Sequence, residues 1–206
     1  MIPTSLSSYI ELLKNQFHLI SEERLETLDR LANIILSTLK SNDVCRIMSI
    51  CTHNSRRSQL MEAWLVAASQ YYNIEGVSAS SGGTEATGFN IRMVLAMRQA
   101  GFHLIEEESG QNPRYNLIPL HETALGHQMF SKKYDESFNP QNDFIAIMVC
   151  DHADQNCPVV LGANHRISLP FLDPKVDDNT PMEHETYMGK IEEIGREIIY
   201  IMSKVA

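Results

Sequence analysis

Hydrophobic and polar residues follow two patterns along this chain, one typical of helices and one of buried strands. Residues 1–43 follow the helical pattern, with apolar residues three or four positions apart. We expect a first helix from a capping box at Ser8 to about Phe17, and a second that begins near Ser21. The second helix carries an apolar stripe of Leu25, Leu28, Ala32, Ile35 and Leu39. This stripe predicts either a face packed within the chain or a contact with a second copy in a homodimer.

From residue 44 onward, short apolar runs alternate with helical segments. The pattern predicts strands at 44–50, 76–80, 143–149 and 165–172, and helices at 57–72, 90–101 and 180–203. Residues 106–142 are the least regular part, with an extended segment over 114–120 and a helical one over 123–134. Strands that alternate with helices favour a parallel sheet with its ligand site at the C-terminal strand ends. We therefore predict an α/β domain over 44–206, on which residues 1–43 pack as a helical extension.

Composition and charge narrow the class of protein. Hydrophobic residues make up 43% and charged residues 21% of the chain, as in an ordinary globular protein. The net charge of -9, without any run of Lys or Arg, disfavours nucleic-acid binding. No segment is apolar for long enough to span a membrane, and the N-terminus lacks the features of a signal peptide. We expect a cytoplasmic protein whose four cysteines are catalytic, redox-active or buried, and not a structural disulfide framework.

The segment from Cys51 to Ser58 carries the clearest chemical signal. It joins the predicted strand 44–50 to the helix 57–72, so it forms a tight polar loop at the C-terminal end of a strand. Backbone amides and a helix N-terminus can bind an anion there, and the Arg57 guanidinium suits a tetrahedral oxyanion. The same positive field favours the nucleophilic thiolate of Cys51; the alternative is a buried structural cysteine. The predicted oxyanion-binding residues are Thr52, His53, Asn54, Ser55, Arg56, Arg57 and Ser58.

A second pair of cysteines follows the predicted strand at 143–149. Cys150 ends that strand, on the same side of the sheet as Cys51, and Cys157 lies seven residues further on. If the intervening segment were helical, the two Cα atoms would be roughly 10 Å apart, whereas a disulfide needs them within about 7 Å. A bond between them therefore requires the segment to bend or unwind. The alternative is two unrelated cysteines, and zinc is disfavoured because there is no Cys-x-x-Cys pair.

Taken together, the two cysteine motifs resemble a known family. The run Cys51-Thr52-x-Asn54-Ser55-x-Arg57-Ser58-Gln59 with Glu62 resembles the low-molecular-weight phosphotyrosine phosphatase superfamily. Within it, Cys150-x-x-Ala153-Asp154-x-Asn156-Cys157-Pro158 is most similar to the thioredoxin-coupled arsenate reductases. Ser81-Gly82-Gly83-x-Glu85 and the acid-loop pair Asp173-Pro174 also match. The resemblance covers most of 44–206 and implies a parallel four-stranded sheet flanked by helices, to which residues 1–43 add a helical pair.

The resemblance also implies a role for each residue of the site. Cys51 attacks arsenate held by the loop and Arg57, Asp173 is the general acid, and Ser58 donates to the Cys51 thiolate. Cys150 then attacks Cys51, and Cys157 attacks Cys150, which leaves a disulfide for thioredoxin to reduce. No tightly bound cofactor is implied. Asn54, Glu62 and Ser81 match positions that bind a potassium ion in some relatives; the alternative is that these residues brace the loop by hydrogen bonds.

Two residues of the loop depart from the family pattern, and a phosphatase is an alternative to the arsenate reductase. His53 stands where the family usually has glycine, so a positive φ there would be strained, and Arg56 adds positive charge near the mouth of the loop. A phosphatase would need only Cys51, Arg57 and Asp173. Lys175 and Val176 follow the acid loop in place of the aromatic residues usual in tyrosine phosphatases.

The third candidate is a non-catalytic oxyanion or redox sensor, in which Asp173 is only a turn residue before proline. We assign no role in the reaction to Cys45 or to five of the histidines. Cys45 lies near the start of a strand and is predicted to be a core residue. The histidines His103, His121, His127, His165 and His184 form no recognisable cluster in the sequence.

Overall fold

The computed structural model describes residues 5–42, 44–118, 120, 126–156 and 159–206, so Cys157 and His121 lie outside the described residues. The elements follow in the order α1 (Leu6–Lys14), η1 (Phe17–Leu19), α2 (Glu22–Ser41), β1 (Cys45–Cys51), α3 (Arg57–Tyr71), β2 (Val77–Gly83), α4 (Ile91–Gln99), β3 (Leu104–Glu108), β4 (Arg114–Leu117), β5 (His127–Met129), β6 (Phe144–Met148), α5 (Asp151–Asn156), β7 (Ala163–Ser168), η2 (Pro174–Asp177) and α6 (Glu183–Val205).

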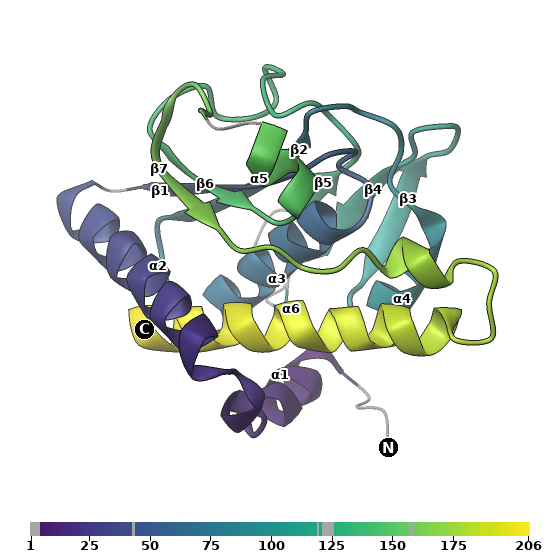
Figure 1. Ribbon diagram of the computed structural model, residues 1–206, viewed down its shortest axis with the longest axis horizontal. Coiled ribbons are helices and arrows are strands. Elements are labelled where there is room, and N and C mark those ends of the chain that lie inside the picture. The colour runs from purple at the N-terminus through teal and green to yellow at the C-terminus, as the bar shows by residue number, and fades with distance from the viewer. Residues whose placement is uncertain (1–4, 43, 119, 121–125, 157–158) are drawn as a thin grey trace.

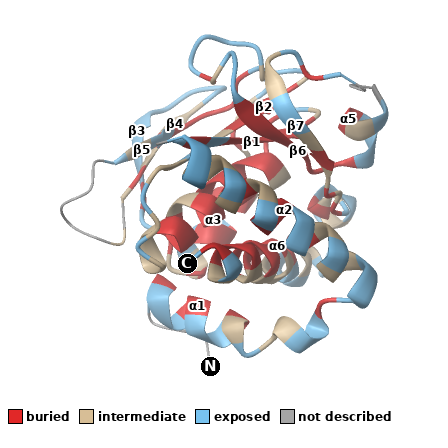
Figure 2. Ribbon diagram, turned by 90° about the vertical axis from the view of Figure 1, so that its left-hand side faces the viewer, coloured by how far each residue is buried: buried red, intermediate tan, exposed pale blue. Residues whose placement is uncertain are grey.

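The central sheet has four parallel strands, as predicted, and their order is β2-β1-β6-β7. Cys51 pairs with Gly83 of β2, and Ile50 pairs with Met148 of β6, so the C-terminal ends of these strands meet at one edge. All five residues of β6 are buried, which explains its continuous apolar run. In Figures 1 and 2, helices α1, α2, α3 and α6 lie on one side of this sheet.

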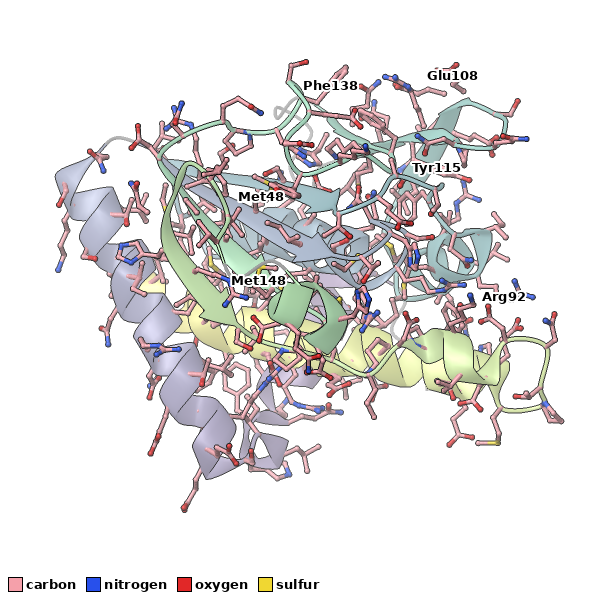
Figure 3. All side chains as sticks on the ribbon, turned by 45° about the horizontal axis from the view of Figure 1, so that its top comes forward. Met48, Arg92, Glu108, Tyr115, Phe138 and Met148 are labelled. Atoms are coloured by element: carbon pink, nitrogen blue, oxygen red, sulfur yellow. The ribbon has the colours of Figure 1, made fainter. Side chains whose placement is uncertain are left out.

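The irregular middle of the chain forms a second, antiparallel sheet of three strands in the order β3-β4-β5. The extended segment predicted over 114–120 is confirmed for Arg114–Leu117. The helix predicted over 123–134 is wrong for its described part, because His127–Met129 is a strand paired with Tyr115–Leu117. A short apolar run fits either periodicity, and here strand pairing decided the outcome. Figure 3 shows Glu108 and Phe138 near the periphery of the molecule, away from Met48 and Met148 in the central sheet.

The two N-terminal helices pack on α6 through their apolar faces. In α2, the side chains of Leu28, Leu31, Ala32 and Ile35 are buried, so the predicted stripe is a packing face within the chain. Figure 2 shows the opposite face of α2 exposed. Helix α2 begins near Ser21 as predicted, and the Ser21 side chain caps it. Helix α1 begins two residues before the predicted capping box at Ser8, because the Ser5 side chain is the cap and accepts from the Ser8 backbone N–H.

Trp64 of α3 fixes the long C-terminal helix against the core. Its ring is fully buried, and its Nε1 donates to the carbonyl of Ile191 at 3.1 Å. Gly195 of α6 permits this close contact with Trp64, since a Cβ there would lie 2.6 Å from the indole ring.

The helix predicted over 180–203 begins at Glu183, after a turn in which the Thr180 hydroxyl accepts from the Met182 N–H. None of the helices in the described ranges has the length and apolar character that a membrane crossing requires.

Candidate active site

Cys51 is the last residue of β1, and the loop 52–56 leads directly into α3 at Arg57. The Cys51 side chain is buried, and its Sγ accepts the Asn54 N–H at 3.1 Å. The Ser58 hydroxyl, one residue into α3, lies 3.0 Å from the same sulfur. The strand–loop–helix arrangement that the sequence predicts therefore surrounds Cys51 with hydrogen-bond donors.

The Asn54 amide fixes the direction of the Ser58 hydroxyl. Asn54 Nδ2 donates to Ser58 Oγ at 2.9 Å and to Ser81 Oγ at 2.8 Å, while its Oδ1 accepts from Gln59 Nε2 at 3.0 Å. Because the Ser58 oxygen accepts a hydrogen bond from Asn54 Nδ2, its own O–H can be directed at Cys51 Sγ as a donor. Two donors then stabilise a thiolate at Cys51, since hydrogen bonds to an ionised acceptor are the stronger ones.

Four successive carbonyls of the loop accept hydrogen bonds from the surrounding chain. These bonds run from Glu85 N to Thr52 O (2.8 Å), Ser131 Oγ to His53 O (3.0 Å), Gln59 Nε2 to Asn54 O (3.2 Å) and Asn90 N to Ser55 O (3.0 Å). Gly83 permits the close packing, because a Cβ there would lie 2.7 Å from Thr52 O. Because these carbonyls are already bonded to the surrounding chain, the loop is held in one conformation, and backbone amides of such a loop can bind an anion, as in a nest.

The positive backbone φ angle that was considered for His53 is found at the next residue, Asn54. Asn54 has a φ of 46°, a left-handed conformation that asparagine tolerates better than most residues, whereas His53 is not among the residues with positive φ. Histidine therefore replaces the family's glycine at this position without that cost. The His53 ring is half exposed, and its Nε2 lies 3.8 Å from the Glu85 carboxylate.

The two arginines of the loop point to different partners. Arg57 Nη1 donates to the Phe171 carbonyl at 2.7 Å, and its Nη2 lies 2.6 Å from Asp173 Oδ2. Arg56 Nη2 lies 3.0 Å from Asp178 Oδ2, and its Nε donates to the Tyr187 hydroxyl at 2.7 Å. The expected charge of Arg56 at the mouth is thus paired with a carboxylate. Burial, and then the bond to Asp178, raises the pKa of Tyr187 to about 12.

Asp173 caps a turn and also contacts Arg57, which follows the Cys51 loop. Its Oδ1 accepts from the Lys175 N–H at 3.0 Å and caps η2, while its Oδ2 faces Arg57. A single small pocket is lined by Cys51, His53, Ser55, Arg56, Arg57 and Asp173. A nucleophile, a guanidinium and a carboxyl group therefore converge on one cavity, which suits attack on a tetrahedral oxyanion with proton transfer to its leaving oxygen.

Cys150 lies at the same edge of the sheet, just after β6. Its side chain is buried, and its Sγ lies 3.6 Å from the Thr52 hydroxyl, beside Cys51 in sequence. The backbone N–H of Ala153, in the short helix α5, also donates to this sulfur at 3.4 Å. The Thr52 hydroxyl lies 3.2 Å from His152 Nδ1 as well. The structure thus brings Cys150 to the loop that follows Cys51, while the predicted third cysteine, Cys157, lies outside the described residues.

Asn54, Glu62 and Ser81, the residues considered for potassium, form one buried network. The Ser81 hydroxyl donates to Glu62 Oε2, and His127 Nε2 lies 2.8 Å from Glu62 Oε1. Burial alone would raise the pKa of Glu62, but the Lys132 charge and the His127 and Ser81 hydrogen bonds outweigh it and hold the pKa below its usual value. Both carboxylate oxygens of Glu62 therefore have partners from the protein, and its negative charge is balanced by a buried lysine.

The sequence did not reveal Lys132 or His127 as part of the site. Lys132 is 3% exposed, with its ammonium 4.8 Å from the centroid of the Phe130 ring, and both residues belong to the region whose pattern was ambiguous. Neither residue carries a signal in the sequence, because Lys132 stands between Ser131 and Lys133, and His127 stands between Gly126 and Gln128. Cys45 lies in the core as predicted, where burial, partly offset by a hydrogen bond with Thr38, raises its pKa to about 11.

Comparisons with sequences of known proteins find arsenate reductases among the relatives of this chain. No model of a known protein family matches the chain. An arsenate reductase of Halalkalibacterium halodurans is 27% identical over 153 residues, which are 74% of this chain and 91% of the relative. Arsenate reductase 2 of Staphylococcus epidermidis is 30% identical over 132 residues, which are 62% of this chain and 77% of the relative.

Solved structures bear on the fold. An arsenate reductase in the phosphate binding state superposes with a TM-score of 0.50 at 15% identity, over 79% of this chain and 100% of its own. A low-molecular-weight phosphotyrosine phosphatase from Vibrio cholerae O395 gives 0.53 at 11% identity, over 77% of this chain and 94% of its own. These similarities confirm the predicted fold class, a parallel four-stranded sheet flanked by helices.

Proposed function

Because this chain belongs to the low-molecular-weight phosphotyrosine phosphatase superfamily, which includes the arsenate reductases, we propose that it reduces arsenate to arsenite through a cysteine relay. Its relatives are named as arsenate reductases, and the pocket around Cys51 suits attack by a thiolate on an oxyanion such as arsenate. The finer proposal concerns the substrate, the order of the thiols and the reductant.

The first step uses the pocket alone. The Cys51 thiolate, supported by the Ser58 hydroxyl and the Asn54 N–H, attacks the arsenic atom of arsenate held by the loop amides and Arg57. A covalent sulfur–arsenic bond forms, and one oxygen leaves as water after Asp173 donates a proton to it. Preorganised donors aimed at the oxyanion stabilise the charge that develops in this step.

The next steps carry two electrons outward. The Cys150 thiolate attacks the Cys51 sulfur, a disulfide forms between them, and the electron pair of the sulfur–arsenic bond stays on arsenic, which leaves as arsenite. The Cys157 thiolate then attacks Cys150, which forms the 150–157 disulfide and releases the Cys51 thiolate. Thioredoxin, the proposed partner, reduces that disulfide by thiol exchange, so no bound cofactor is required.

The observation that carries the reductase proposal is the contact between Thr52 and Cys150. The 3.6 Å between Thr52 Oγ1 and Cys150 Sγ sets a second thiol against the residue that follows Cys51. A phosphatase has no use for this thiol, because water regenerates its cysteine. A hydroxyl at that distance can also hold the Cys150 proton or stabilise its thiolate.

Hydrolysis of a small phosphate ester is the second candidate function. It is supported by the shared pocket of Cys51, Arg57 and Asp173, which is sufficient for attack and leaving-group protonation without Cys150. Lys175 and Val176, which follow Asp173-Pro174 in the sequence, are not the aromatic residues that would line a slot for phosphotyrosine. A purely sensing role, the third candidate, gives no reason for the Asp173 carboxylate to face Arg57.

The Glu62 network does not fit an added potassium ion. Its carboxylate is already bonded by His127 and Ser81 and balanced by the charge of Lys132, so a second cation would meet a buried ammonium. Asn54 also directs its NH2 group, not its carbonyl, at Ser81 and Ser58. We infer that Lys132 supplies the positive charge and that the network braces the loop without a metal.

A coupled assay tests the proposed function. The protein is incubated with arsenate, thioredoxin, thioredoxin reductase and NADPH, and NADPH oxidation is compared with hydrolysis of a chromogenic phosphate ester by the same preparation. We expect sustained, arsenate-dependent NADPH oxidation that stops when thioredoxin is omitted. Ester hydrolysis without arsenate turnover would replace the reductase with the phosphatase, and inactivity in both assays would leave the oxyanion sensor.

A further inference from the structure

The N-terminal extension reaches the acid loop through one side chain. Arg24, in the first turn of α2, places its guanidinium carbon 4.6 Å from the centroid of the Phe171 ring. Phe171 is buried and lies two residues before Asp173. A guanidinium over an aromatic face within about 6 Å is attracted to it, more strongly where water is excluded. An element outside the catalytic domain thus contacts the segment that carries the proposed acid.

Arg24 is itself held in one orientation. Its Nε lies 2.9 Å from both carboxylate oxygens of Glu197 on α6, and the Glu197 side chain is only 8% exposed. The guanidinium is planar, so this bond fixes the plane that it presents to Phe171. Lys190, also on α6, lies 6.0 Å from the centroid of the same ring. Two cations therefore lie near this aromatic ring, and one of them, Arg24, is held by a carboxylate.

The backbone of Phe171 is fixed from the opposite side. Its carbonyl accepts from Arg57 Nη1 at 2.7 Å, and its N–H donates to the Val149 carbonyl at 3.1 Å. The same arginine contacts Asp173 through Nη2. Phe171 is thus the residue at which the extension, the strand end before Cys150 and the oxyanion arginine all meet.

From this chain of contacts we propose that Arg24 is a positioning residue, through which the N-terminal helices hold Phe171 and thereby set Asp173 and Arg57 for proton transfer. The inference rests on the proposed role of Asp173 as general acid. In this role Arg24 contacts no substrate and transfers no proton. It restricts the movement of the acid loop, which carries Phe171 and Asp173. Displacement of a catalytic group by about 1 Å can cost up to about 10²-fold in rate, so a lost ring contact can affect catalysis from a distance.

A double-mutant cycle separates positioning from general stability. Single-turnover rates are measured for wild type, Arg24→Ala, Asp173→Asn and the double variant, with arsenate or, if arsenate is not turned over, with a phosphate ester. We expect Arg24→Ala to slow wild type about 10-fold, with Arg24→Lys in between, and to slow the Asp173→Asn background less than about 2-fold. An equal loss in both backgrounds, or no loss in either, overturns the inference.

Two controls on the same helix complete the test. Leu28→Ala removes a fully buried side chain and should lower the melting temperature without lowering the single-turnover rate at a temperature where it is folded. Arg30→Ala removes an exposed charge and should change neither. Amide exchange in 171–177 should quicken in Arg24→Ala and not in Leu28→Ala. Inactivity of wild type toward both substrates refutes the proposed function itself, and unchanged exchange in Arg24→Ala then refutes the inference independently.

Discussion

Arg57 and Asp173 form an ion pair in which Nη2 lies 2.6 Å from Oδ2, at the mouth of the pocket that holds Cys51. The arginine that the sequence assigns to the oxyanion and the aspartate that it assigns to the acid therefore contact each other directly. Since one guanidinium cannot give both of its Nη groups to an anion and keep these bonds, substrate binding must compete with Asp173 and the Phe171 carbonyl. Oxyanion binding and placement of the acid are thus linked.

Asp173→Asn should separate binding from chemistry. The amide lacks an acidic proton, so the single-turnover rate should fall by about 10²–10⁴-fold. Oxyanion affinity should stay equal or rise, because Arg57 loses its charged competitor. Calorimetric titration with phosphate and a rapid-quench measurement check the two halves. An unchanged chemical step would reduce Asp173 to a cap of η2.

The hydrogen bonds at Cys51 predict graded effects of substitution. Cys51→Ser should abolish turnover, because a hydroxyl without an adjacent base is a poor nucleophile at neutral pH. Ser58→Ala removes one of the two donors to the thiolate, and we expect a loss of about 10-fold in rate, as for one charge-assisted hydrogen bond. Alkylation by iodoacetamide, monitored by peptide mass, should slow at Cys51 in Ser58→Ala. Cys45 serves as the internal control and should stay unmodified near neutral pH, since its thiol is buried and its pKa is about 11.

The local parts of this site could be predicted from the sequence, because they are contiguous. Cys51 to Ser58 combines a strand end, a polar loop and a helix start, and each has its own pattern. The pairing of Arg56 with Asp178 could not be predicted, since the two residues lie 122 positions apart and the sequence pattern does not encode such a contact. The same holds for Glu62 with His127 and Lys132, which come from a segment whose apolar spacing fits helix and strand equally.

Replacing Lys132 should show whether its ammonium group, and not a bound potassium ion, balances the charge of Glu62. In wild type, activity should be the same in potassium, sodium or choline buffers of equal ionic strength. Lys132→Met leaves the Glu62 charge without its balancing ammonium, so we expect lower thermal stability and lower activity. Lys133→Met, at the exposed neighbouring position, is the matched control and should behave as wild type. Stimulation of wild type by potassium alone would contradict the inferred role of Lys132.

Glu62 should also contribute to acid unfolding. Its pKa is held below the usual value in the folded protein, so its contribution to stability is present above about pH 4.5 and is lost as the pH falls through the lower, folded-state value. Glu62→Gln should therefore be less stable than wild type at pH 7, and the difference should shrink below pH 4.5. Denaturant unfolding at pH 7, 5 and 3.5 measures it. A difference that does not change with pH would show that the Glu62 charge is not what the network stabilises.

Substitution of the two relay cysteines, Cys150 and Cys157, distinguishes an arsenate reductase from a phosphatase. Cys150→Ser and Cys157→Ser should each stop multiple turnover with arsenate and leave phosphate-ester hydrolysis largely unchanged, because only arsenate reduction consumes two thiol electrons. Cys157→Ser should accumulate a 51–150 disulfide, since Cys150 lies at the catalytic loop beside Thr52.

Wild type oxidised by one equivalent of arsenate should instead carry the 150–157 disulfide. Helix α5 spans Asp151–Asn156. If the helical rise extended from residue 150 to residue 157, the two Cα atoms would be roughly 10 Å apart, and the bond would require α5 to bend or unwind. We expect faster amide exchange over the described residues of α5 after oxidation, and peptide mapping by mass spectrometry identifies the linkage. If oxidised protein lacks the 150–157 bond and both serine variants still reduce arsenate repeatedly, the relay is refuted, and Cys51 must regenerate by another route.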